Sequence, residues 1–258
     1  GNKIITMTVS TFIRKIGSFF HIISRKIDKA PHTNINSRWF ETSYSQSGED
    51  LIINYVAKVL LGIKEVSYID VGAMHPCVYS NTYHFYEKNE TGICIEANPS
   101  LIPDFHKYRP NDNIINAGVV GAKSKEEKLK FYIFNDHSLS TFDENEAVKN
   151  SKINGNKIID KIYVKTITLN SLLETKTPTF ISIDIEGLDF EVIKSIDFKK
   201  YKIPIICLET NDHITEEKNN TLINYIENQG YFRYADTLIN SIFVQIDFWN
   251  KRFEKYRT

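Results

Sequence analysis

The sequence predicts an α/β domain built on a mostly parallel sheet. From residue 44 onward, short apolar runs bounded by turn residues alternate with helical patterns. This alternation is typical of βαβ units. The length of 258 residues suits one large domain or one domain with an appendage, and the 41% of hydrophobic and 25% of charged residues are ordinary values for a globular protein.

The predicted elements follow one another in a regular order. Strands are expected where apolar, β-branched runs end at Gly, Asn or Pro: residues 67–73, 92–98, 114–121, 128–134, 161–169, 179–187, 203–211, 231–240 and 241–247. Helices are expected where apolar residues recur at three- and four-residue spacing: residues 79–89, 100–108, 190–198 and 216–229, the last ending before Gly230.

Two parts of this order depart from simple alternation. The strands at 128–134 and 161–169 are not joined by a clear helical pattern, so they are expected to form an added antiparallel piece. The polar stretch 143–160 between them is expected to be a mobile loop. The last two strands are expected to pair as a hairpin.

The domain boundary is placed between residues 43 and 44. Residues 1–43 are predicted to be an N-terminal amphipathic helix and linker, and residues 44–258 the α/β domain. Residues 1–30 carry six basic side chains and one acidic side chain. Such a helix can lie peripherally on an anionic membrane surface, or it can dock through its apolar face on the domain or on a second subunit as a homodimer. Both alternatives stay open.

Composition excludes several classes of protein. The 32 Lys and Arg balance the 32 Asp and Glu, which argues against a nucleic-acid binder. No run of 18 apolar residues is present, so no membrane-spanning helix is expected. The three cysteines, Cys77, Cys94 and Cys207, are too few and scattered for a disulfide framework, which favours a reduced, cytoplasmic chain.

Acidic side chains end four of the predicted strands. Asp70 ends the first strand, Glu96 the second, Asp184 and Glu186 a later one, and Glu209 the next. In open α/β sheets, ligands bind beyond the carboxyl ends of the strands, near the point where the strand order reverses. Four acidic strand ends on one edge therefore predict a functional cleft.

The spacing of the first two strand ends suggests a nucleoside cofactor. Glu96 lies 24 residues after Gly72, across one βαβ unit, where an acid can accept hydrogen bonds from both ribose hydroxyls. Gly72 has no Cβ and lets the backbone approach a ligand closely. It stands alone and not in a G-x-G-x-x-G sequence, so no cradle for a pyrophosphate is evident. A cofactor with a ribose and no phosphate, such as S-adenosylmethionine, fits this pattern.

Five motifs, in this order, resemble the FkbM family of methyltransferases. They are YSQSGEDL (44–51), YIDVGA (68–73), SNTY (80–83), GICIEANP (92–99) and SIDIEG (182–187). The resemblance spans roughly residues 44–247. It implies a Rossmann-like class I methyltransferase fold, with a mostly parallel seven-stranded sheet, helices on both faces and a C-terminal antiparallel hairpin. It also implies S-adenosylmethionine as cofactor and O-methylation of a saccharide or related natural product, a small-molecule or glycan acceptor.

The resemblance also assigns residues to the site. The residues that it places at the cofactor are Gln46, Glu49, Asp70, Gly72, Ala73, Glu96, Ala97, Asn98, Asn116 and Ala117. The first acidic strand end would line the methionine part, the second would hold the ribose, and the third strand end would face the adenine. Asp184 and Glu186 would lie nearest the transferred methyl group.

A positioned carboxylate suits methyl transfer to a hydroxyl. The base removes the hydroxyl proton, which contributes roughly 10²–10⁴-fold to the rate. Asp184 or Glu186 is the expected base, and the alternative for Asp184 is a contact with the cofactor amine. His137 is a further alternative, in a polar loop with Ser138, Ser140 and Thr141 that is a candidate acceptor contact. A divalent cation held by Asp184, Glu186 and Glu209 is a side alternative, and no metal site is expected.

Two other functions remain open. The lone glycine of the first motif permits a non-catalytic binding or scaffold protein that keeps the fold. An NAD-dependent sugar-modifying enzyme is disfavoured by the missing G-x-G-x-x-G sequence. Tyr79, Tyr83 and Tyr86 are expected to be packing residues and not a platform for a sugar.

Overall fold

A computed structural model describes residues 41–121, 126–185, 187–211 and 217–252. The chain divides into two compact units, residues 1–42 and residues 43–258, and every helix and strand named below belongs to the second. The helix expected within residues 1–43 lies outside the described residues and stays a prediction. None of the helices in the described part has the length and hydrophobicity needed to span a bilayer.

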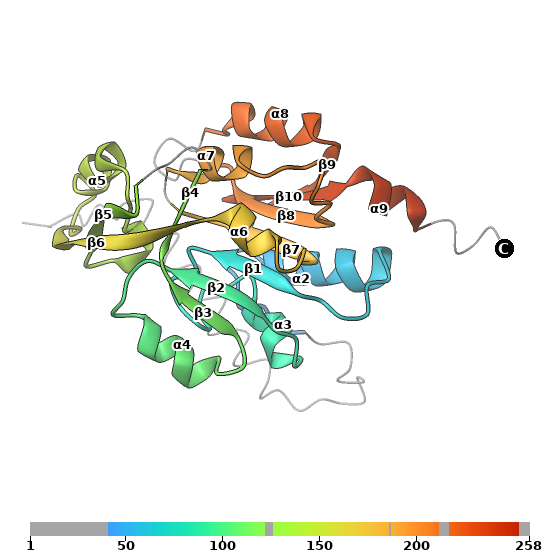
Figure 1. Cartoon of the computed structure of the whole chain (residues 1–258), viewed down its shortest axis with the longest axis horizontal. Coiled ribbons are helices and arrows are strands. Elements are labelled where there is room, and N and C mark those ends of the chain that lie inside the picture. Colours follow the sequence, from blue (N-terminus) through green and yellow to red (C-terminus); the bar gives the residue numbers. More distant parts are fainter. Residues whose placement is uncertain (1–40, 122–125, 186, 212–216, 253–258) are drawn as a thin grey trace, which may run out of the picture. The chain divides into compact units, whose positions relative to one another are not determined.

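The domain is built on a seven-stranded sheet with the order β3-β2-β1-β7-β8-β10-β9 (Figure 1). Its strands are β1 (Tyr68–Val71), β2 (Gly92–Glu96), β3 (Asn113–Asn116), β7 (Phe180–Ile183), β8 (Ile205–Glu209), β9 (Tyr231–Asp236) and β10 (Asn240–Gln245). Five neighbouring strands of this sheet are parallel to one another: β3, β2, β1, β7 and β8. The strand β10 is antiparallel to both β8 and β9. The predicted mostly parallel sheet with a C-terminal antiparallel hairpin is confirmed.

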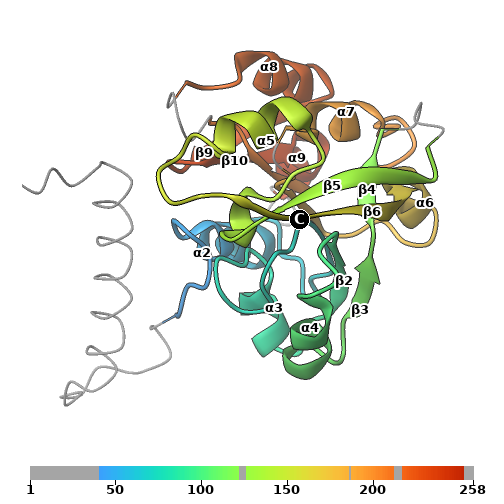
Figure 2. The ribbon, with the colours of Figure 1, turned by 90° about the vertical axis from the view of Figure 1, so that its left-hand side faces the viewer.

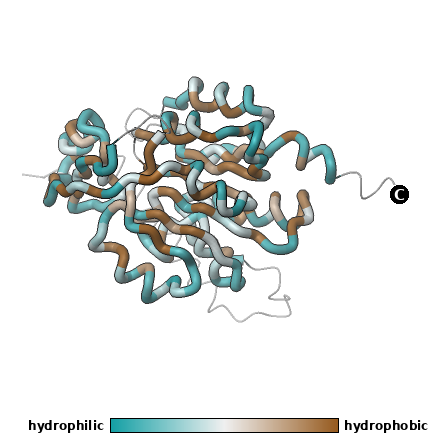
Figure 3. The backbone as a smooth tube through the Cα atoms, viewed as in Figure 1, coloured by the Kyte–Doolittle hydropathy of each residue, from teal (hydrophilic) through white to brown (hydrophobic). Residues whose placement is uncertain are grey.

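Helices cover both faces of this sheet. Successive strand residues point to opposite faces, so Ile69 and Val71 of β1 join one apolar core while Tyr68 joins another. The first core includes side chains from α6 (Leu169–Leu173), α7 (Asp189–Lys194) and α8 (Asn220–Asn228). The second includes side chains from α2 (Glu49–Asn54), the π-helix Tyr55–Leu60, α3 (Tyr83–Glu87), α4 (Ile102–Tyr108) and α9 (Ile246–Lys251). Figure 3 shows hydrophobic segments gathered in the central strands.

The run 114–121 forms two strands, and the prediction of a single strand is wrong. The chain leaves the main sheet after β3, and β4 (Gly118–Val120) pairs with β6 (Ile158–Thr168) in a second sheet, of order β4-β6-β5. The Asn116 side-chain amide donates to the carbonyl oxygens of Glu96 and Ala97, at 2.8 and 3.1 Å, where the next ladder bonds would form. The added antiparallel piece is present, because β5 (Lys128–Phe134) pairs antiparallel with β6.

The segment 143–160 contains a helix, α5 (Glu144–Asn150), so the prediction of a loop is wrong there. Asp143 caps this helix, because its carboxylate accepts the backbone N–H groups of Asn145 and Glu146 at 2.7 and 3.0 Å. Ala147 packs against apolar residues of β5 and of the turn that follows it. Figure 2 shows α5, β5 and β6 side by side. One buried alanine leaves too weak an apolar pattern for the sequence to reveal the helix.

Candidate functional site

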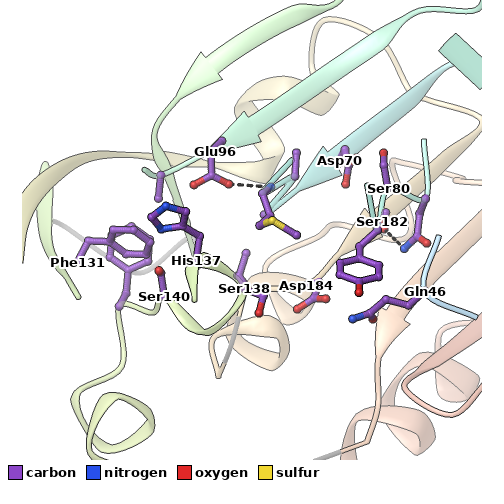
Figure 4. Close-up of a pocket in the computed structure, with 18 residues that line it drawn as sticks. Gln46, Asp70, Ser80, Glu96, Phe131, His137, Ser138, Ser140, Ser182 and Asp184 are labelled. Carbon is purple, nitrogen blue, oxygen red and sulfur yellow. Dashed lines mark hydrogen bonds between the residues drawn. The ribbon is translucent and has the colours of Figure 1, made fainter. Parts of the chain in front are cut away.

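A pocket lies at the carboxyl ends of β1, β2 and β7 (Figure 4). It encloses about 790 Å³, counting the space open to solvent. The strand order reverses between β1 and β7, which is the position where open α/β sheets bind ligands.

Gly72 allows β1 and β7 to approach each other at the pocket. Its φ is +81°, and a Cβ at this position would lie 1.9 Å from the carbonyl oxygen of Asp184. The N–H groups of Gly72 and Ala73 both donate to the carbonyl oxygen of Ile95, at 3.0 and 3.1 Å. The glycine is therefore required by the backbone of β7, in addition to any approach to a ligand.

Glu96 is held rigidly in the pocket wall. One carboxylate oxygen accepts the N–H of Met74 at 2.8 Å and the other accepts the N–H of Asn98 at 2.6 Å. The residue is only 6% exposed, and burial raises the pKa of its carboxyl group to about 7, against the opposing effect of these backbone hydrogen bonds. Met74 has a φ of +48°, a conformation that costs about 1–3 kcal/mol for a non-glycine residue. The loop after β1 is thus fixed against Glu96.

Asp70 and Asp184 line the same pocket from neighbouring strands. Asp70 is buried, and one of its carboxylate oxygens accepts the hydroxyl of Thr82 at 2.6 Å. Burial raises the pKa of Asp70, and the nearby Arg109 guanidinium and the Thr82 hydrogen bond oppose this shift. Asp184 lies across the pocket from His137, together with Ser182 (Figure 4).

The loop after β7 is organised by a second buried acid. The carboxylate of Asp189 accepts the N–H groups of Ile185 and Gly187 at 3.2 and 3.3 Å, and burial raises the pKa of this carboxyl group. These bonds hold the backbone that follows Asp184. Glu186, the other expected catalytic acid, lies outside the described residues, so its role stays a prediction.

Six of the residues that the sequence places at the cofactor line the pocket: Gln46, Asp70, Gly72, Ala73, Glu96 and Ala97. Four others lie outside this lining: Glu49, Asn98, Asn116 and Ala117. Asn98 and Asn116 support residues of the pocket wall. The backbone N–H of Asn98 donates to the Glu96 carboxylate, and the side-chain amide of Asn116 donates to the carbonyl oxygens of Glu96 and Ala97.

Glu49 joins two distant parts of the domain. It is fully buried at the start of α2, and its carboxylate accepts the Thr237 hydroxyl at 2.6 Å and the Asn240 amide at 3.2 Å. The other oxygen accepts the N–H of Ser47 at 2.8 Å. These contacts tether α2 to the turn between β9 and β10, and the role of Glu49 at the cofactor stays a prediction.

Sequence reasoning missed an aromatic pair in the pocket. Phe131 of β5 and Phe142 line it with ring centroids 4.6 Å apart. Both pack with Ala97, which directly follows β2. The expected acceptor contacts His137, Ser138 and Ser140 line the pocket from the same segment. A phenylalanine in an apolar strand gives no sign that it faces a pocket, so no sequence signal distinguishes these rings from core residues.

Tyr79 is not a packing residue, contrary to the prediction. It lines the pocket, and 54% of its surface is exposed. Its φ is +56°, which is uncommon for an aromatic residue. Tyr83 does pack, with its ring against those of Tyr44 and Tyr86.

The described residues contain no group of three His, Cys, Asp or Glu side chains arranged to hold a metal ion. Glu186, one of the three expected ligands of a cation, is not among them.

The family model for the FkbM methyltransferase domain matches residues 70–233, which is more than half of the chain. The chain belongs to the FkbM methyltransferase family. It is a methyltransferase that uses S-adenosylmethionine. The pocket suits this cofactor, because a buried carboxylate fixed by two backbone N–H groups can accept hydrogen bonds from hydroxyl groups, and further acids suit a cationic sulfonium. No match to the chain is found among curated proteins.

Two methyltransferases are among the solved structures that are similar to this one. A precorrin-6y C5,15-methyltransferase from Geobacter metallireducens is 12% identical, with a TM-score of 0.39, over 75% of this chain and 84% of that chain. The 1,6-didemethyltoxoflavin-N1-methyltransferase of Burkholderia thailandensis, with bound 1,6-didemethyltoxoflavin and S-adenosylhomocysteine, is 8% identical, with a TM-score of 0.36, over 88% of this chain and 87% of that chain.

Proposed function

We propose that this FkbM methyltransferase transfers a methyl group to a hydroxyl of a saccharide or related natural product. One observation carries the proposal: a strand-end carboxylate, Asp184, shares its pocket with an exposed aromatic ring, Tyr79, and with polar side chains. Saccharides present hydroxyls to polar groups and C–H faces to aromatic rings. A tyrosine ring offers a large, rigid and amphipathic surface of this kind.

The cofactor takes the part of the pocket nearest β1 and β2. Glu96 accepts hydrogen bonds from the ribose hydroxyls, since its two oxygens are already oriented by backbone N–H groups. Asp70 accepts from the ammonium group of the methionine part. Phe131 and Phe142 would hold the adenine, because these rings adjoin Ala97, which directly follows Glu96. This placement leaves Tyr79 and Asp184 for the acceptor.

Asp184 acts as the general base. The cofactor supplies a methyl group that its sulfonium already activates, so the protein mainly orients the two reactants and removes the hydroxyl proton. As the acceptor oxygen bonds to the methyl carbon and the carbon–sulfur bond breaks, the hydroxyl proton passes to the Asp184 carboxylate. A base so placed contributes roughly 10²–10⁴-fold. Glu186 is the second candidate for this role.

The charge of the pocket favours an uncharged acceptor. Asp70, Glu96 and Asp184 all line it, and carboxylates repel phosphate and carboxylate groups while they attract a sulfonium. A neutral glycan or glycoside is therefore preferred over a nucleotide-activated sugar.

Mass spectrometry after incubation with labelled S-adenosylmethionine tests the proposal. Neutral glycans should gain one labelled methyl group, and nucleotide sugars should gain less. Asp184→Asn should lower kcat by at least 10²-fold with the cofactor Kd unchanged. Turnover by this variant at the wild-type rate would exclude Asp184 as the base. If calorimetry detects no binding of S-adenosylmethionine at millimolar concentration, the result favours a non-catalytic scaffold protein instead.

A further inference from the structure

A fully buried arginine lies next to the cofactor side of the pocket. Arg109 directly follows α4 and has no exposed surface. Its Nε and one Nη both contact the same oxygen of Asp112, at 2.8 and 2.7 Å. The Asp112 carboxylate also accepts the Tyr68 hydroxyl at 3.0 Å and the N–H of Gly92 at 2.8 Å. Buried charges of this kind are rare unless they are paired and hydrogen-bonded, and this pair is both.

The other side of the guanidinium points toward the pocket. Its Nη1 donates to the Thr82 hydroxyl at 2.9 Å, and that hydroxyl donates to the Oδ2 atom of Asp70 at 2.6 Å. An arginine has no acceptor, so Thr82 must accept from it and has a single proton left to donate. The Ser80 hydroxyl is the competing acceptor, at 3.2 Å, and the shorter distance favours Asp70. The three groups therefore form a chain of hydrogen bonds with one direction.

This chain of hydrogen bonds reaches an aspartate whose negative charge burial disfavours. Asp70 lies near the carboxyl groups of Asp112 and Glu96, whose negative charges disfavour its own, and near the thiols of Cys94 and Cys207, whose pKa burial raises. Asp184 lines the same pocket. Burial raises the pKa of Asp70, and Arg109 is the cation that opposes this effect. Among the described residues, hydrogen bonds reach only Oδ2 of Asp70, which leaves Oδ1 to a ligand in the pocket.

We infer that Arg109 is a positioning residue for the cofactor, which acts through the Thr82 hydroxyl to hold Asp70 ionised and oriented. The inference rests on the proposed placement of Asp70 at the cofactor ammonium. An ionised carboxylate attracts that ammonium, whereas a protonated one does not. The sequence shows Arg109 only as one more basic residue after a helix, and the fold brings its guanidinium to Thr82, the hydrogen-bond partner of Asp70.

The test is a double-mutant cycle on the affinity for S-adenosylmethionine, measured by calorimetry without acceptor. Thr82→Val removes the hydroxyl and keeps the shape, and Thr82→Ser is the matched control that keeps the hydroxyl. Thr82→Val should weaken binding about tenfold or more, and Thr82→Ser less than about threefold, because a hydrogen bond to a charged group is lost in the first variant alone. On an Asp70→Asn background, Thr82→Val should change the Kd by less than about twofold. Thr82→Ala replaces the valine variant if the latter does not fold.

The pH dependence gives a second readout. Affinity falls as pH drops through the pKa of Asp70, and this fall should begin at a higher pH in Thr82→Val than in Thr82→Ser. Arg109→Gln combined with Asp112→Asn, which removes both buried charges together, should shift the fall upward as well, while Arg109→Lys keeps a cation and should shift it less. Asp70→Asn, which keeps Glu96, supplies the reference profile in which Asp70 does not titrate.

The outcomes distinguish the placement of Asp70 at the cofactor ammonium from the hydrogen-bond chain through Thr82. If Asp70→Asn leaves the Kd unchanged, the placement of Asp70 at the ammonium is wrong and the inference fails with it. If Asp70→Asn weakens binding but Thr82→Val adds its full effect on that background, the placement holds and the chain through Thr82 is wrong. Equal affinity of Thr82→Val and Thr82→Ser would also overturn it.

Discussion

Glu96→Gln is the substitution that most directly probes the cofactor site. The two carboxylate oxygens of Glu96 accept the N–H groups of Met74 and Asn98, at 2.8 and 2.6 Å. A glutamine has one acceptor oxygen and one amide donor, so it cannot accept from both backbone groups. It also cannot carry the negative charge that strengthens hydrogen bonds from the ribose hydroxyls.

The magnitude follows from the pKa of Glu96. Burial raises this pKa from 4.5 to about 7, a difference that corresponds to about 3 kcal/mol. Between these two pH values the native state holds the proton and the unfolded state does not. The free energy of unfolding contributed by Glu96 therefore falls as pH rises from 4.5 to 7, and it is constant above that.

Cofactor binding should be linked to the same proton. Ribose hydroxyls bind the ionised form, so binding at pH 6 must first release the proton. The affinity should fall about tenfold from pH 8 to pH 6 if the pKa of free Glu96 is near 7. Glu96→Gln should remove this dependence and weaken binding at pH 8 by about 10–100-fold, since hydrogen bonds to a charged group contribute about 1.5–3 kcal/mol.

Calorimetry at pH 6, 7 and 8, in two buffers of different ionisation enthalpy, measures both the Kd and the protons released. Glu174→Gln is the matched control, because Glu174 is exposed and pairs at its surface with Lys200. The reasoning is refuted if the wild-type Kd is constant over this range with no proton release. It is also refuted if Glu96→Gln retains the wild-type pH profile.

The remaining predictions concern the architecture of the pocket and its acceptor side. Gly72→Ala should destabilise the domain in chemical denaturation by clearly more than the matched Gly155→Ala. Both glycines have positive φ (+81° and +87°), which alone costs about 1–2 kcal/mol, but only at Gly72 would the new Cβ meet a backbone atom, at 1.9 Å. Equal losses of stability would contradict this contact. Glu49→Ala should lower the free energy of unfolding by about 1–3 kcal/mol, since it leaves the half-buried Thr237 and the buried Asn240 without their acceptor, while the cofactor Kd changes little. Tyr79→Ala should raise the acceptor KM severalfold at an unchanged cofactor Kd, and an unchanged KM would remove Tyr79 from the acceptor site.

Where the local pattern of apolar and turn residues determines an element, the sequence was sufficient to predict that element. The runs 67–73 and 92–98 contain β1 and β2 because strands buried on both faces read as continuous apolar segments bounded by turn residues. The helix that precedes Gly230 ends where the glycine predicts, with a φ of +86° at that residue. The run 114–121 misled the prediction because β3 and β4 pair with strands of two different sheets, and this tertiary pairing leaves no mark in the local pattern.

The same distinction separates the site residues. Asp70, Glu96 and Asp184 were predictable as neighbours because parallel strands bring their carboxyl ends to one edge, so position in the chain implies position in space. Phe131, Phe142 and Tyr79 reach the pocket from the second sheet and from a loop in an uncommon backbone conformation, and no periodicity marks them.

We expect the strand-end acids to bind the cofactor and the loop residues to bind the acceptor. The strand-end acids come from the parallel core, where the register of β1 against β2 and β7 fixes them. Their geometry suits the cofactor, which is the same in every turnover. His137, Ser138 and Ser140 come from a short turn after β5, and Tyr79 from the loop after β1, so these side chains can change without altering the register of the main sheet. Loops carried on a rigid scaffold are where binding specificity is most easily varied. Exchange of the segment 135–140 between family members should therefore change the acceptor preferred and leave the cofactor affinity unaltered.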